Sequence, residues 1–324
     1  MKKIFVSTVL AISAAFASFG ASATDLKMLT SWGENHSGTK NIAYVYRDMV
    51  EEKSGGDVKF TTFGPEVVPG GKQLQPVASG VFDVVFTHGL YHTGVTGIGA
   101  AIDAVDKDVD KRRSSGVWGW IDQYYQTTQN LKVLSIPTAH SGFRMLLKDP
   151  MPSDGLLKGK KIRALPSYNA LVDNLEAAPV VIPFGELYSS LEKGVVDGMI
   201  WPSVGIVGFK FHEVAPNLVD PVFGSVSYMV MMNLDKWNSL DGDEQKLLLD
   251  AGYELEKHTV TTFNELLQEE NSVMAKAGAK AAEYVNLSKS DLEELFAKQA
   301  MKVAVDNTGK DGEAFRDFVK AKGL

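Results

Sequence analysis

Hydrophobic and polar residues follow two different periods along this chain, and the two periods alternate. Period-two alternation or a short apolar run, each typical of a strand, covers residues 25–32, 57–64, 81–87 and 131–139. Between the first two of these strands, residues 39–56 carry apolar positions at helical spacing and end in a glycine pair. A shorter helix is predicted just before the third strand. Strands that alternate with helices predict a parallel sheet covered by helices.

The same alternation repeats in the middle of the chain. Strands are predicted at residues 159–166, 179–183 and 195–201, and helices at residues 167–177 and 185–194. A helical region near residues 105–130 separates the two series, which predicts two α/β domains. From Ser239 onward the pattern is helical, with Ser239 or Asp241 as the candidate N-cap. A helix of that length could lie across both domains.

The first 23 residues have the pattern of a targeting segment. Lys2 and Lys3 precede an apolar run from Ile4, and the segment ends in Ala-Ser-Ala at residues 21–23. This pattern predicts a secretory signal peptide over residues 1–23, so we expect the mature chain to begin near Thr24 and to reach the periplasm. An N-terminal membrane anchor is the weaker alternative, because the segment is short and rich in alanine and serine.

Composition narrows the classes of function. The chain has 324 residues, no cysteine and a formal net charge of −7, which becomes −9 once the two charges of Lys2 and Lys3 are removed. Such a chain is a poor partner for nucleic acid or for an anionic membrane surface. The lack of cysteine excludes disulfides and thiolate metal sites. Beyond the first segment no apolar run is long enough to span a bilayer, so we expect no stable membrane insertion.

Motifs of catalysis and cofactor binding are not found. The glycine-rich residues 93–101 do not form a dinucleotide-binding fingerprint, and the chain has neither a phosphate-binding loop nor a nucleophile elbow. His88 and His92 are four residues apart, but no cysteine or adjacent carboxylate completes a metal site, and ordinary polar histidines explain them. The acidic run over residues 103–110 is typical of a solvated helix face. We therefore expect no enzyme, no cofactor and no metal.

Arg163 is the residue that the pattern alone leaves unexplained. It lies among Ile162, Ala164 and Leu165, which look like part of a buried strand, and on the strand face opposite Ile162 and Ala164. A solvated arginine on an edge strand is the usual interpretation of such a residue, since arginine is mostly exposed. A ligand-binding arginine is the alternative, and periodicity does not choose between the two.

A longer block around Arg163 carries a family resemblance. Residues 157–202 read LKGKKIRALPSYNALVDNLEAAPVVIPFGELYSSLEKGVVDGMIWP. Within the block, Arg163 is followed in order by Pro183, Phe184, Glu186, Tyr188, Gly194, Asp197 and Gly198. This order resembles that of the substrate-binding proteins of tripartite ATP-independent periplasmic (TRAP) transporters, dicarboxylate type. Three further stretches, residues 70–86, 141–159 and 234–248, resemble other parts of the same family, so the likeness spans nearly the whole mature chain.

The resemblance implies roles for two arginines. The family's arginine at the position of Arg163 faces the cleft and forms a fork-like salt bridge with the carboxylate of the ligand, a geometry that suits a planar guanidinium. Arg144 matches a position where many members keep a second cleft arginine. The alternative for Arg144 is a salt bridge that orients Arg163.

The resemblance also implies an aromatic part of the site. Trp201 stands where many members have a ligand-binding asparagine, so an indole with a large apolar face replaces an amide. Phe184 matches an aromatic residue that often covers the ligand. Trp32 and His88 follow strands at points where members contact the ligand. Together these four residues are expected to form an apolar wall, which favours a compact organic acid with an apolar or ring portion.

The predicted fold is accordingly a two-domain α/β periplasmic binding protein, a clamshell with parallel-rich sheets, crossing strands and a long helix that spans both lobes. Lobe 1 is expected to contain residues 24–140 and 226–268, and lobe 2 residues 141–225 and 269–324. Without a ligand, repulsion between the two arginines is expected to hold the lobes apart.

The predicted function is capture of a small organic anion and its delivery to the membrane permease subunits of a TRAP transporter, by a monomeric protein. Two alternatives stay open. The chain could serve a sensor kinase instead of a permease, or it could be a periplasmic enzyme, which the missing catalytic motifs disfavour.

Overall fold

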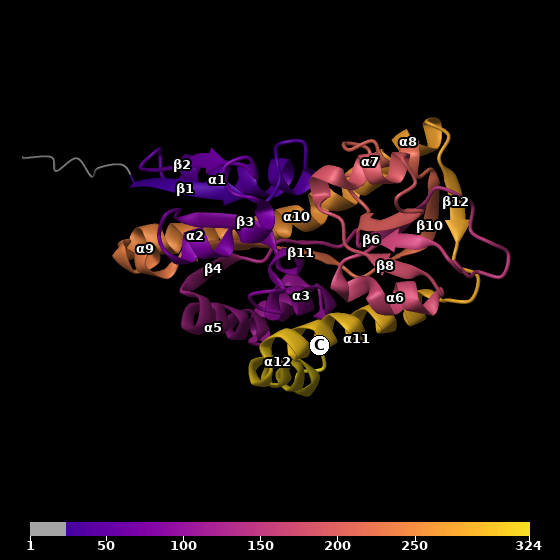
Figure 1. The fold of residues 1–324 in the computed structure, drawn as a ribbon. Coiled ribbons are helices and arrows are strands. Elements are labelled where there is room, and N and C mark those ends of the chain that lie inside the picture. Colours follow the sequence, from indigo (N-terminus) through magenta and orange to yellow (C-terminus); the bar gives the residue numbers. More distant parts are fainter. Residues whose placement is uncertain (1–23) are drawn as a thin grey trace, which may run out of the picture.

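The chain folds into two α/β lobes that lie side by side (Figure 1). The computed structural model describes residues 24–324, so the predicted signal peptide lies outside the described residues. Each lobe is built around a six-stranded sheet with helices on both faces. The predicted two-lobed α/β fold is confirmed. None of the helices from residue 24 onward has the length and apolar character needed to cross a membrane.

The sheet of lobe 1 has the strand order β2-β1-β3-β11-β4, and β5 pairs with β11 beside this path. Its strands are β1 (Thr24–Thr30), β2 (Val58–Phe63), β3 (Val84–His88), β4 (Leu131–Ser135), β5 (Thr138–Ala139) and β11 (Val226–Asn233). β1 is parallel to β2 and β3, whereas β11 is antiparallel to β3, β4 and β5. Every residue of β3 and β11 is buried, because helices cover both faces of the sheet.

The helices of lobe 1 form two layers. One layer contains α1 (Tyr44–Lys53), which follows a π-helical turn (Thr39–Ala43), and part of α10 (Gly242–Lys276). The other layer contains α2 (Leu74–Ala78), α3 (Ile98–Ala101) and α5 (Val117–Gln129), and α4 (Val109–Ser114) and α9 (Leu234–Ser239) lie nearby. Strand alternation serves both layers: Val230 and Met232 of β11 pack with the first, and Met229 and Met231 with the second.

The sheet of lobe 2 has the order β12-β10-β6-β9-β7-β8. Its strands are β6 (Phe143–Leu147), β7 (Lys161–Arg163), β8 (Ala178–Val180), β9 (Gly198–Pro202), β10 (Asn217–Phe223) and β12 (Lys280–Glu283). On one face lies α6 (Asn169–Asn174), and on the other lie α7 (Leu187–Glu192) and α8 (Phe211–Val214).

Both sheets are mixed, whereas the sequence pattern predicted parallel-rich sheets. In lobe 2, β7 is parallel to β8 and β9, but β6 is antiparallel to β9 and β10. The antiparallel strands belong to two crossings between the lobes, where β5 continues into β6 over residues 140–142 and β10 continues into β11 over residues 224–225. One crossing runs from lobe 1 to lobe 2 and the other runs back, so β10 lies antiparallel to β6 and β11 lies antiparallel to β5.

α10 is the predicted long helix and contacts both lobes (Figure 1). Asp241 is its N-cap and forms a capping box with Glu244, which satisfies backbone N–H groups of the first turn. Along the helix, Leu255 lies in a core shared with the strands of lobe 1, and Met274 lies in the core of lobe 2. The helix ends at Lys276 and β12 follows, so the helical pattern predicted from Ser239 onward is interrupted by a strand.

α11 (Lys289–Thr308) is a second helix that contacts both lobes. Phe296, in its first half, stacks on Tyr168 of lobe 2, and its second half packs against α3 of lobe 1. α12 (Lys310–Ala321) packs against α5, with the ring of Phe315 centred 4.8 Å from that of Trp120. The C-terminal helix α12 therefore packs on lobe 1, although it belongs to the range 269–324 that was predicted for lobe 2.

Gly252 permits the close contact between α10 and β4, and we expect its replacement to be destabilising. A Cβ at this position would lie 2.3 Å from the carbonyl oxygen of Leu134. Alanine exceeds glycine in helix propensity by about 1 kcal/mol. Even so, G252A should lower the free energy of unfolding by roughly 1–3 kcal/mol, because the helix must move away from the sheet. Chemical denaturation measures this difference.

Gly242→Ala is the matched control, because a Cβ at the start of α10 meets no atom within 4 Å. This variant should leave stability unchanged or slightly raised. If G252A proves as stable as G242A, the contact between α10 and β4 is looser than the structure shows.

Candidate functional site

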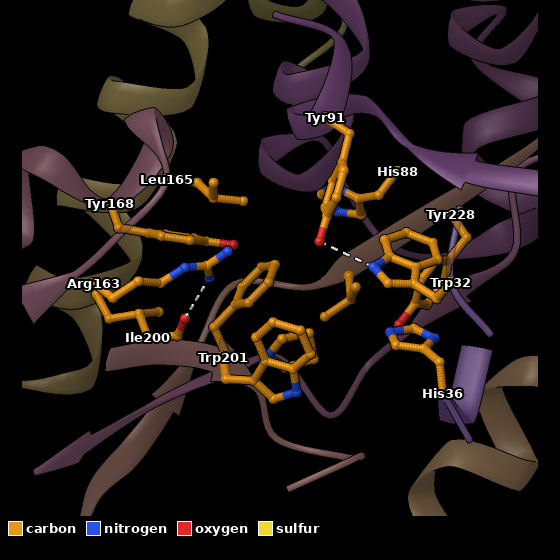
Figure 2. A pocket seen from close by; sticks show the side chains of 13 residues that line it. Trp32, His36, His88, Tyr91, Arg163, Leu165, Tyr168, Ile200, Trp201 and Tyr228 are labelled. Atoms are coloured by element: carbon orange, nitrogen blue, oxygen red, sulfur yellow. Dashed lines mark hydrogen bonds between the residues drawn. The ribbon is translucent and has the colours of Figure 1, made fainter. Parts of the chain in front are cut away.

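The two lobes enclose a small pocket between them (Figure 2). It lies beyond the carboxyl ends of β1, β3 and β7, the edge at which α/β sheets bind ligands. Lobe 1 contributes Trp32, His36, His88, Tyr91, Val226 and Tyr228. Lobe 2 contributes Phe143, Arg163, Leu165, Tyr168, Ile200, Trp201 and Pro202.

Arg163 is the last residue of β7 and its side chain enters the pocket (Figure 2). It is only 3% exposed, which rules out the solvated edge-strand interpretation. Its Nη1 donates one long hydrogen bond of 3.4 Å to the carbonyl oxygen of Ile200, and its Nε has no partner. No residue lining the pocket is acidic, and in the part of the chain from residue 24 onward no carboxylate forms an ion pair with this guanidinium.

Burial lowers the pKa of Arg163, and the nearby Tyr91 and Tyr168 oppose that fall. The guanidinium nevertheless remains a cation at neutral pH, because its unperturbed pKa is so high. The pocket therefore contains a buried positive charge that the protein itself leaves without a counter-ion.

Trp32 lies two residues beyond β1 and lines the pocket, as predicted for a residue at a strand end. Its Nε1–H donates a 2.9 Å hydrogen bond to the hydroxyl oxygen of Tyr91. Its ring is stacked on that of His36 at a centroid distance of 4.4 Å. Trp32 thus has no free donor for a ligand and contributes ring surface to the pocket.

His88 ends β3 and also lines the pocket, and each of its ring nitrogens faces a group of the protein. The backbone N–H of Leu90 donates to Nδ1 at 3.2 Å, so that the ring proton is on Nε2. Nε2 lies 3.0 Å from Oδ2 of Asp103, an ion-pair distance whose geometry falls short of a hydrogen bond. His88 can therefore offer a ligand only its ring surface.

Asp103 corrects one expectation drawn from the acidic run. Instead of lying on a solvated helix face, it is 3% exposed and accepts a 2.6 Å hydrogen bond from the backbone N–H of Ser227. His92 faces away from the pocket and its Nε2 lies 2.7 Å from Oγ1 of Thr87. Across residues 24–324, no group of histidine and acidic side chains is arranged to hold a metal ion.

Trp201 forms the aromatic wall on the side of lobe 2. The Cζ atom of Arg163 lies 5.5 Å from the centroid of its ring, within the range of a cation–π contact. Its Nε1 has no hydrogen-bond partner and lies near Gly205, in the turn that follows β9. Phe184 was expected to cover the ligand, but it does not line the pocket. It stacks on Trp201 at 5.5 Å and supports that indole from behind.

Arg144 does not line the pocket, which corrects the expectation of a second cleft arginine. Side chains alternate along β6, so while Phe143 faces the pocket, Arg144 points to the other face of the sheet. Its Nη2 donates to Asp220 at 2.9 Å and its Nη1 to Asn271 at 2.8 Å. The alternative prediction for Arg144 was a salt bridge that orients Arg163. Arg144 does form a salt bridge, but its partner is Asp220 and the pair does not contact Arg163. Repulsion between two cleft arginines therefore has no basis in this structure.

Five aromatic residues of the pocket were missed by sequence reasoning: His36, Tyr91, Phe143, Tyr168 and Tyr228. His36 and Tyr91 follow β1 and β3 closely, so the argument from strand ends extends to them. Tyr168 follows β7 in the same way, after the proline that ends the strand. Tyr228 lies on β11, and its place in the pocket depends on the crossing of the chain between lobes, which has no local signal.

The lobes are closed around the pocket. His36 of lobe 1 has its ring centroid 6.3 Å from that of Trp201 and 6.0 Å from that of Phe209, both in lobe 2. The neighbouring turn also contacts lobe 2, since a Cβ on Gly208 would lie 3.3 Å from the carbonyl oxygen of Asn35. Closure thus buries the aromatic residues of both lobes against each other.

Two α/β lobes joined by crossing strands, with a buried cation facing an enclosed pocket, define a ligand-binding protein of the clamshell class. The chain belongs to the bacterial extracellular solute-binding protein family 7 (DctP), whose sequence model matches residues 29–310. The predicted family is confirmed. The protein is an extracytoplasmic solute-binding component of a TRAP transport system and not an enzyme.

Individual relatives differ in what they bind. The ectoine-binding periplasmic protein TeaA of Halomonas elongata is 28% identical over 178 residues, which cover 53% of this chain and 52% of TeaA. A TRAP periplasmic solute-binding protein from Desulfovibrio salexigens, solved with bound orotic acid, has a TM-score of 0.78 at 19% identity and covers 92% of this chain and 98% of that one. DctP7 of Bordetella pertussis, a receptor binding pyroglutamic acid, has a TM-score of 0.74 at 16% identity and covers 92% and 100%. At these identities the likeness to solved structures shows the fold alone.

Two buried histidines predict a loss of stability in mild acid. Burial, with a smaller effect of His88, lowers the pKa of His36 and of His92 to about 3, from an ordinary value near 6.5. Both stay neutral in the folded protein and take up a proton on unfolding, so stability falls as the pH drops below about 6.5. Between pH 7 and pH 5, each should lower the free energy of unfolding by roughly 2 kcal/mol. Denaturant titrations at the two pH values measure the loss.

His92→Gln tests the assignment, because glutamine can keep a hydrogen bond to Thr87 without titrating. In this variant, the decrease in the free energy of unfolding between pH 7 and pH 5 should be smaller than in the wild type by roughly 2 kcal/mol, the contribution of one histidine. A loss as large as that of the wild type would mean that His92 is already protonated in the folded state.

Proposed function

We propose that this protein captures a compact monocarboxylate with a flat ring or apolar body and delivers it to the membrane permease subunits of a TRAP transporter. Arg163 holds the carboxylate through paired guanidinium donors, and the aromatic residues of both lobes cover the rest of the ligand. Removal of the signal peptide at residues 1–23 leaves a mature chain in the periplasm, where it works as a monomer. The family supports capture of a small solute outside the cytoplasm.

The unpaired charge of Arg163 is the observation that carries this proposal. Taking a guanidinium out of water costs several kcal/mol of desolvation free energy. This cost is offset only when the buried charge has an ion-pair partner with good geometry. The protein offsets little of this cost, because Arg163 donates a 3.4 Å hydrogen bond to Ile200 and otherwise approaches only the neutral hydroxyl group of Tyr91. A ligand carboxylate supplies both the missing charge and two acceptor atoms, and the planar guanidinium fork matches its geometry.

A single acidic group is sufficient for this pocket. Arg144 is committed to Asp220, and the ring nitrogens of His88 face Leu90 and Asp103, so neither side chain is free to hold a second carboxylate. The second group of a dicarboxylate would find hydroxyl groups and aromatic rings but no second lysine or arginine among the lining residues, which compensates a buried charge poorly. A polyhydroxylated acid would meet a lining made mostly of aromatic and aliphatic surface.

The shape of the pocket favours a flat ligand body. Ring surfaces of Trp32 and Tyr228 line it from lobe 1, and Trp201 lines it from lobe 2. Aromatic side chains bind flat groups through their faces and edges. Because both lobes close around the pocket, only a compact molecule fits between them.

Replacing Arg163 tests the carboxylate site. R163A should weaken binding of the ligand by roughly 30-fold to several-thousand-fold, because a desolvated charge-assisted pair is worth about 2–5 kcal/mol. R163K should also bind poorly, since an ammonium group cannot reproduce the fork. Titration calorimetry measures both, with thermal unfolding as the check that each variant is folded. Binding by R163A within about threefold of the wild type would remove Arg163 from the site.

A thermal-shift panel tests the class of ligand. Pyroglutamate, orotate and benzoate represent ring monocarboxylates, 2-oxobutyrate an open-chain one, malonate a dicarboxylate and galacturonate a polyhydroxylated acid. A ring monocarboxylate should raise the melting temperature most, and the shift should grow as its concentration exceeds the dissociation constant. A larger shift with malonate or galacturonate would overturn the ligand class while leaving the role of Arg163 to the mutational test.

A further inference from the structure

Tyr91 places a hydroxyl group in the pocket opposite the arginine. It belongs to a short 3-10 turn (Gly89–His92) that follows β3, and it lines the pocket from lobe 1, whereas Arg163 lines it from lobe 2. Figure 2 shows the Tyr91 hydroxyl reaching the pocket from the top of the view and the Arg163 guanidinium from the left. The two groups are close enough that Arg163 opposes the rise in the pKa of Tyr91 that burial causes.

The hydrogen bond from Trp32 determines which role the Tyr91 hydroxyl can play. An indole Nε1–H is a donor only, so Tyr91 accepts in this 2.9 Å contact. The phenolic proton must then point elsewhere, and among the residues that the structure describes Tyr91 donates to no acceptor. Accepting a hydrogen bond also polarises the O–H group and makes it a better donor. Tyr91 is thus a donor held in place by a second residue.

We propose that Tyr91 donates its hydroxyl proton to the same carboxylate that Arg163 binds, so that the ligand's anionic group joins the two lobes. This inference rests on the proposed function of Arg163 and adds a residue that determines specificity. Trp32 is a positioning residue in this arrangement, because it acts through the Tyr91 hydroxyl. Tyr168 belongs to the same lobe as Arg163, so a hydrogen bond from Tyr168 to the carboxylate would not connect the two lobes.

The arrangement selects against neutral analogues of the acid. Arg163 and Tyr91 present only donors to the end of the ligand that they share. A carboxylate offers acceptors to both lobes, whereas a primary amide must turn its NH₂ group toward one of these donors. The amide would therefore lose one lobe's contact as well as its charge.

The test uses a matched pair of probes and three variants. The acid probe is whichever of pyroglutamate, orotate and benzoate binds most tightly, and the second probe is its primary amide. Y91F should weaken binding of the acid about ten- to a hundredfold, the range for a hydrogen bond to a charged group. Binding of the amide should change by less than threefold, so the preference of the protein for acid over amide should fall. Y284F is the control, because the buried Tyr284 hydroxyl has no partner and lies outside the pocket.

Trp32→Phe separates positioning from direct contact. In the W32F background, the Tyr91→Phe change should cost much less affinity for the acid than in the wild type, since Trp32 acts through Tyr91. Equal costs in both backgrounds would overturn the positioning role of Trp32.

The failures of the two proposals are distinguishable. If R163A loses the acid but Y91F keeps both affinity and acid preference, Tyr91 does not contact the carboxylate and only this inference falls. If R163A also retains the acid, or if none of the three acids binds, the proposed function fails and the role of Tyr91 fails with it.

Discussion

The closed pocket depends on one electrostatic constraint, which is the burial of a guanidinium between the lobes without a counter-ion from the protein. Arg112 is equally buried, but it donates to Thr138 and Ser227 and to three backbone carbonyl oxygens. Arg144 has a carboxylate partner. Within residues 24–324, the chain thus gives these two buried arginines several acceptors or a counter-ion, and it leaves Arg163 with one long hydrogen bond to a carbonyl oxygen and the neutral hydroxyl group of Tyr91. A bound anionic solute would supply the counter-charge and the acceptor atoms that Arg163 lacks.

The surrounding architecture holds this charge in place. Ile162 and Ala164, on either side of Arg163, are fully buried, so the end of β7 is anchored in the core of lobe 2. β9 is the parallel neighbour of β7 and brings Trp201 to the same edge of the sheet. Phe184 then supports the indole from behind. Because a solvent-exposed arginine would adopt many rotamers, this support reduces the entropy lost when a carboxylate is bound.

Local pattern was sufficient for some of this architecture and insufficient for the rest. Strand alternation put Arg163, Trp32 and His88 in or just after strands, which depends only on the nearby sequence, and the family resemblance then implied that they face the ligand. Arg144 was misplaced because a family position does not reveal which face of β6 a side chain occupies. Asp103 was misplaced because its partners, His88 and Ser227, come from other elements. The strand β12 and the lobe of α12 also depend on tertiary contacts, which no helical period encodes.

The two helices that cross between the lobes have a mechanical consequence. α10 and α11 are each continuous and each packs against both lobes, and the crossing strands add two further connections. The lobes are therefore not tethered by flexible linkers, and their relative motion is restricted to modes that bend or slide these elements. A restricted open state has fewer arrangements to lose on closing, so less of the ligand's binding energy is spent on ordering the protein. The stiffness of the frame thereby contributes to affinity without touching the solute.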